Sequence, residues 1–77
     1  MEAKELGSIL KGLYDNAKRG QQVTKIHLFG IKYSEEILKA GIRQVIIESG
    51  IRSTYATEVS KGVNLADWVK LTKDIQE

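Results

Sequence analysis

The sequence predicts an all-α fold, a small four- to five-helix bundle that contains a helix-turn-helix and forms one domain over residues 1–77. Apolar residues recur three and four positions apart through much of the chain, which is the spacing of one helix face. Proline is absent, and glycines 9 to 12 residues apart fall where short helices are expected to end: Gly20, Gly30, Gly41, Gly50 and Gly62. Short helices joined by tight turns account for both patterns.

Composition restricts the class of protein more than its function. Leu, Ile, Val and Phe make up 22 of the 77 residues, which is too many for a disordered tail. Cysteine is absent, so a disulfide framework and a thiolate metal site are excluded. The polar start and the lack of a run of roughly 20 apolar residues favour a cytoplasmic protein without a membrane partner. A net charge of +2 permits a nucleic-acid partner but does not argue for one.

Residues 3–19 are expected to form the first helix. Five apolar side chains fall on one face of a 3.6-residue period: Leu6, Ile9, Leu10, Leu13 and Ala17. Lys18 and Arg19 would complement the helix dipole in the last turn, and Gly20 would end the helix.

The next segment is ambiguous between helix and strand. β-Branched and aromatic residues over 24–33 suit a strand. Four apolar residues of the same region suit a helix equally well by their spacing: Ile26, Phe29, Tyr33 and Ile37. We favour a short helix over 24–30 capped by Thr24, then a helix over 34–40, because a lone strand would have no partner in so small a chain.

Residues 65–75 are expected to form the last helix, with Asn64 as its cap and Asp67 in its first turn. Its apolar face would contain five residues: Leu65, Trp68, Val69, Thr72 and Ile75. A short terminal strand is the weaker alternative. Trp68 is expected at a contact, either with the first helix or with a second subunit.

The most specific pattern lies within residues 42–62. A helix of about two turns would be followed by a corner at Gly50-Ile51 and by a second helix over 53–61 that ends before Gly62. Two short helices that cross steeply need a corner residue free of Cβ clash, then an inward apolar residue. They also need small or apolar residues where they touch, and five residues supply these: Val45, Ile46, Ser49, Ala56 and Val59.

The stretch 50–62 resembles the turn and recognition helix of repressor-type helix-turn-helix domains of the Cro and phage-repressor kind. The corner glycine, the apolar Ile51, the inward pair Ala56 and Val59, and the closing pair 61–62 carry the resemblance.

A second and looser similarity is to short uncharacterised bacterial helix-turn-helix-like proteins, and it implies a fold rather than an activity. It rests on the segments 26–33, 53–58 and 61–62.

Two features depart from the repressor pattern. Ile46 stands where alanine is usual, which predicts a wider spacing of the two helices. Glu58 is expected on the outward face of the second helix, where a carboxylate repels phosphates.

The repressor resemblance implies double-stranded DNA as the ligand and a transcriptional regulator acting as a homodimer. Residues at the start of each motif helix would meet the backbone or base edges, and residues further along the second helix would face the major groove. The eight candidates are Arg43, Gln44, Arg52, Ser53, Thr54, Thr57, Glu58 and Lys61. The alternative is a helical module that docks a protein partner and binds no DNA, which the nearly balanced charge favours.

No pattern indicates catalysis, so we expect neither an enzyme nor a cofactor or metal site. His27, the single histidine, lies between apolar neighbours, which predicts a partly buried structural residue. Glu35 and Glu36 are adjacent and would point about 100° apart on a helix, so they cannot act as a facing acid–base pair.

Overall fold

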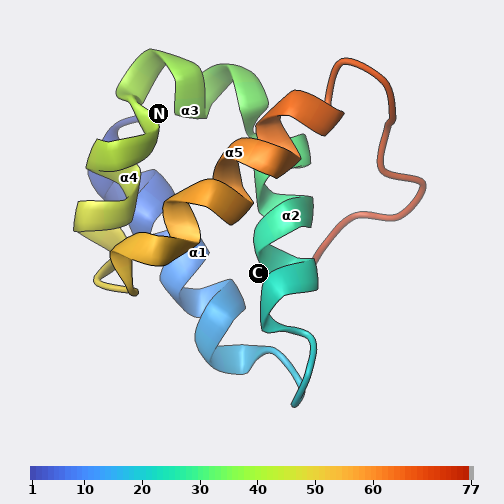
Figure 1. The fold of residues 1–77 in the computed structure, drawn as a ribbon, viewed down its shortest axis with the longest axis horizontal. Coiled ribbons are helices and arrows are strands. Elements are labelled where there is room, and N and C mark those ends of the chain that lie inside the picture. Colours follow the sequence, from blue (N-terminus) through green and yellow to red (C-terminus); the bar gives the residue numbers. More distant parts are fainter. Residues whose placement is uncertain (77) are drawn as a thin grey trace.

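The computed structural model of the chain describes residues 1–76, which form five α-helices and one short 3₁₀ helix (Figure 1). In chain order these are α1 (Ala3–Asn16), α2 (Gln22–Lys32), α3 (Ser34–Ala40), α4 (Ile42–Ser49), η1 (Ser53–Tyr55) and α5 (Ala56–Leu65). No strand occurs within this part of the chain, so the predicted all-α bundle is confirmed, and the ambiguous segment 24–33 is helical up to Lys32.

The helices pack in two crossed pairs. α1 lies mainly against α4, and α2 lies mainly against α5, while the short α3 bridges the top of the bundle (Figure 1). Every helix except η1 contributes to one core, and its fully buried large side chains are Leu6, Leu10, Ile26, Phe29, Ile37, Val45 and Val59. The α4–α5 unit is therefore supported from behind by α1 and α2 and keeps one side open to solvent.

Glycines allow the closest of these helix contacts. A Cβ on Gly62 of α5 would overlap the His27 carbonyl oxygen and lie 2.9 Å from the Cα of Gly30 on α2. A Cβ on Gly7 of α1 would lie 2.7 Å from the Glu48 backbone carbon on α4. Both helix pairs therefore approach to backbone contact at positions where only glycine fits.

The predicted bounds of the first two helices are partly wrong. α1 ends at Asn16 rather than at residue 19, because Ala17 is extended (φ −66°, ψ 139°). Gly20 does adopt a positive φ of 83°, but it lies in the turn before α2. α2 begins at Gln22 and runs to Lys32, beyond both ends of the predicted 24–30 segment, so the proposed cap lies inside the helix.

The predicted C-terminal helix over 65–75 is also wrong. The second motif helix was predicted to end before Gly62, but α5 continues through this glycine to Leu65. Gly62 is the point where α5 contacts α2. The following residues form a turn and then an irregular segment that returns to α2 (Figure 1). That segment buries Ile75 in the core and pairs Asp74 with Lys32 at 2.8 Å between Oδ1 and Nζ.

Trp68 lies in the turn after α5 and is 85% exposed. The expected contact with the first helix is therefore wrong, and contact with a second subunit stays a prediction.

Candidate nucleic-acid interface

The corner between α4 and α5 has the geometry of a tight helix-turn-helix turn. Gly50 is left-handed (φ 75°, ψ 3°), and its N–H donates to the carbonyl oxygens of Ile46 and Ile47 at 3.2 Å each. The next residue, Ile51, points inward and is 9% exposed. The corner glycine and the inward isoleucine are therefore placed as predicted.

Ser49 has a larger role in this corner than its small size suggested. Its hydroxyl donates to the Ile46 carbonyl at 2.6 Å and accepts the N–H of Ile51 at 3.2 Å. The side chain is buried, and both hydrogen bonds lie inside the turn. A serine before a corner glycine is the sequence signal for these two hydrogen bonds, because its hydroxyl can pair with backbone groups of the turn.

An open groove of about 1000 Å³ lies between α4 and α5 on the solvent side. Its lining residues are Ile42, Arg43, Ile46, Ile47, Ser53, Ala56, Thr57, Ser60, Lys61 and Asn64. Ile46, the residue that predicted a wide helix spacing, is in this lining together with Ala56 from the opposite helix. The charged side chains among the described lining residues are two cations, Arg43 on α4 and Lys61 on α5.

The structure brings four of the eight predicted contact residues to this groove: Arg43, Ser53, Thr57 and Lys61. Three others are exposed but lie outside its lining: Gln44, Arg52 and Thr54. The amide Nε2 of Gln44 donates to Oε2 of Glu48 at 3.5 Å, along α4. Sequence reasoning missed Ser60 and Asn64, although both lie three or four residues from a predicted contact on the same helix face.

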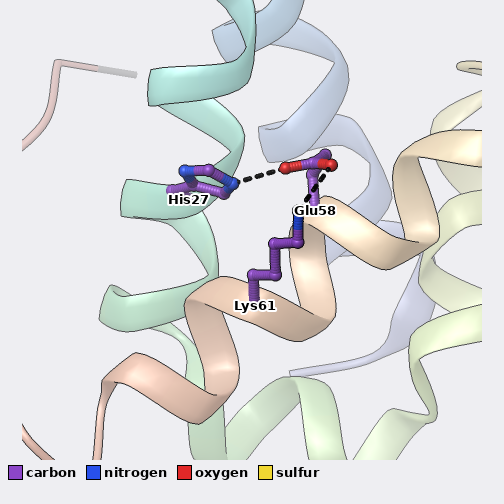
Figure 2. A network of polar contacts seen from close by, with 3 residues as sticks. All are labelled: His27, Glu58 and Lys61. Atoms are coloured by element: carbon purple, nitrogen blue, oxygen red, sulfur yellow. Dashed lines mark hydrogen bonds and ion pairs between the residues drawn. The ribbon is translucent and has the colours of Figure 1, made fainter.

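Glu58 does not face outward as predicted. Its carboxylate turns toward α2, where Oε1 lies 2.6 Å from Nε2 of His27, and Oε2 accepts a hydrogen bond from Nζ of Lys61 at 3.4 Å (Figure 2). Successive helix residues are about 100° apart, so Glu58 occupies the α2 flank while Thr57 faces the groove.

The polar contacts of Glu58 also affect its charge state. The hydrogen bond with His27, with a smaller contribution from Lys61, holds the pKa of Glu58 below its usual value, so the carboxylate stays ionised. His27, whose partner this carboxylate is, is partly buried, as predicted.

The start of the second motif helix is anchored to α1 by two tyrosines. The rings of Tyr14 and Tyr55 are 5.3 Å apart between centroids, and their hydroxyls are 3.4 Å apart. Hydrogen bonding with Tyr14 raises the pKa of Tyr55. This contact fixes η1, and with it the exposed residues Arg52 to Thr54, against the body of the domain.

The described part of the chain contains no cluster of three or more potential metal ligands. None of its helices is both long and apolar enough to cross a membrane.

Fold and corner together define a helix-turn-helix class of domain, and comparison with known proteins agrees. A family model described as an HTH-like domain matches residues 2–72, so the chain belongs to this family. No curated protein and no solved structure matches the chain. The narrower resemblance to repressors of the Cro and phage kind stays a prediction.

Proposed function

We propose that this protein binds duplex DNA through the α4–α5 face. The observation that carries the proposal is the charge of the groove, whose described lining contains Arg43 and Lys61 but no carboxylate. Hydroxyl and amide side chains line the same groove and can donate to phosphates or base edges: Ser53, Thr57, Ser60 and Asn64.

The position of Glu58 supports the same proposal. A carboxylate at the centre of the DNA-facing surface would repel phosphates, and here it is turned to the α2 flank and paired with His27. Arg52 is exposed directly before η1, at the start of the second motif helix, whose first residues contact base edges in helix-turn-helix proteins. With Arg43 on α4 and Lys61 on α5, it gives the face three cations, one from each motif helix and one from the turn between them.

We further propose that the protein regulates transcription as a symmetric dimer, since helix-turn-helix regulators usually read two half-sites about 34 Å apart. The exposed Trp68 beside the end of α5 is the candidate dimer contact, together with Leu65 and Val69, which are 41% and 44% exposed.

The test is fluorescence anisotropy with a labelled duplex of random sequence at about 50 and 200 mM salt, because phosphate contacts are salt-dependent. Replacement of Arg43 or Lys61 by alanine is expected to weaken binding and to reduce the slope of log affinity against log salt by about one. Lys11→Ala on α1 is the matched control, since it removes the same charge outside the groove. Absence of binding at the lower salt, or an equal effect of all three variants, would refute the proposal.

A second candidate function is docking of a protein partner in the same groove. The observation that favours it is the isoleucine surface of α4, where Ile42, Ile46 and Ile47 line the groove and Ile47 is 61% exposed. Ile47→Lys distinguishes the two functions. If DNA occupies the groove, this substitution should raise the affinity for duplex DNA. If a protein occupies the groove, it should leave the affinity for duplex DNA unchanged.

A further inference from the structure

His27 lies where α2 and α5 make their closest approach. Gly30 and Gly62 meet at this crossing with no room for a Cβ on either residue. His27 is one turn before Gly30 on α2, and Glu58 is one turn before Gly62 on α5. The crossing therefore brings the imidazole and the carboxylate together, with Nε2 and Oε1 2.6 Å apart (Figure 2).

The two carboxylate oxygens of Glu58 contact two different side chains. One oxygen contacts His27, whose side chain is 30% exposed, and the other contacts Lys61, whose side chain is 59% exposed and lies at the edge of the groove. With a neutral imidazole, the three side chains sum to zero charge, because Lys61 alone balances Glu58. With a protonated imidazole they sum to +1, and Glu58 no longer needs Lys61 as its counterion.

We propose that His27 is a positioning residue for DNA binding: it holds Glu58 on the α2 flank of α5, and its protonation releases Lys61 to a phosphate. The inference rests on the proposed function and adds a residue outside the α4–α5 face to it. Histidine side chains change charge between about pH 5 and 8, a range in which the Glu58 carboxylate stays ionised. Affinity for duplex DNA should therefore rise as the pH falls through this range.

Several charged groups on α2 and on the elements around it pair with groups other than His27 and Glu58. Asp74 of the C-terminal segment pairs with Lys32 of α2 at 2.8 Å, and Lys11 and Asp15 pair within α1 at 3.2 Å. From α3, Glu36 pairs with the amino group of Met1 at 3.0 Å. On α5, Glu58 contacts His27 and Lys61 contacts Glu58, and Tyr55 of η1 bonds to Tyr14 of α1. Each of these pairs is also present in the His27→Gln variant, so comparison of this variant with the wild type isolates the imidazole.

The experiment measures duplex affinity at about pH 8 and pH 6, spanning the range in which imidazole titrates. The wild-type protein is expected to bind about two- to fivefold more tightly at the lower pH, which is the effect of one exposed ion pair. Its salt slope should steepen by about one counterion. His27→Gln keeps a hydrogen-bond donor for Glu58 but does not titrate, so its affinity should not change with pH.

Two further variants separate positioning from a merely structural role. Glu58→Gln should bind at pH 8 as tightly as the wild type binds at pH 6, because Lys61 then has no competing carboxylate. A structural role alone predicts weaker binding by this variant. Lys61→Met should remove the pH response, whereas the matched variant Lys11→Met on α1 should retain it.

A measurement without DNA tests the contact itself. In the free protein at high pH, nitrogen chemical shifts of the imidazole should place its proton on Nε2, where it donates to Glu58. A proton on Nδ1 would overturn the inference. Binding with the same pH profile in the wild type and in His27→Gln would overturn it while leaving the proposed function intact. Absence of duplex binding at both pH values would overturn both.

Discussion

The crossing of α2 and α5 can be tested by adding one methyl group. Gly62→Ala places a Cβ against the His27 carbonyl oxygen, 2.9 Å from the Cα of Gly30 and 3.1 Å from the His27 carbonyl carbon. These are backbone atoms of a packed helix, so a side-chain rotation cannot relieve the overlap. The two helices must separate, which loosens the packing of their buried side chains, among them Phe29 on α2 and Val59 on α5.

The expected magnitude follows from two opposing terms. Alanine in place of glycine favours a helix by about 1 kcal/mol. Overpacking of a well-packed contact typically costs about 1–3 kcal/mol, and here the obstacle is backbone, which favours the upper part of that range. We expect the free energy of unfolding to fall by about 2 kcal/mol, which lowers Tm by about 10 °C in a domain of this size.

The assay is urea denaturation followed by far-UV circular dichroism. Fluorescence of Trp68 is a poor reporter, because this side chain is 85% exposed in the folded state. Gly12→Ala in α1 is the matched control, since a Cβ there meets no atom within 4 Å. It should stabilise the protein by about 0.5–1 kcal/mol. A Gly62→Ala variant as stable as Gly12→Ala would refute the close-crossing argument.

Two other substitutions test the corner and the α2–α5 ion pair. Ser49→Ala leaves the Ile51 N–H without its acceptor inside the turn, and urea denaturation should show a loss of about 1–2 kcal/mol. Because the pKa of Glu58 is held below its unfolded value, its contribution to stability is present above the unfolded pKa and is lost as the pH falls through the folded pKa. As the pH falls from about 5 to 3, the Tm of Glu58→Gln should therefore decline less steeply than the Tm of the wild type. Equal slopes of Tm against pH would contradict the role of His27 in holding this carboxylate.

Local pattern accounted for much of the fold. The start of α4, the left-handed corner at Gly50 and the inward Ile51 depend on properties of neighbouring residues, so they could be predicted from the sequence. The apolar stripe of the first helix was also sufficient to place its core-facing side, and Leu6, Leu10 and Leu13 are buried. Its end was mispredicted, because Lys18 and Arg19 suit a last helical turn by charge without requiring one.

The candidate site was predicted less completely. Exposure of Arg43, Thr57 and Lys61 follows from helix periodicity, since these positions lie away from the core residues of the same helices. The orientation of Glu58 could not follow from periodicity, because its partner His27 is 31 residues away in the sequence. A residue on the flank of a helix can turn to either side, and the neighbouring helix decides which.

The sequence by itself therefore determined that this protein is a bundle of short helices with a helix-turn-helix corner. Helix periodicity and the left-handed freedom of Gly50 are local properties of the chain. The tertiary structure alone decided that Gly62 continues a helix instead of ending it, and that Glu58 faces α2 instead of solvent. Both outcomes have one physical cause, which is that the backbones of α2 and α5 meet at Gly30 and Gly62. This contact brings Glu58 within reach of His27.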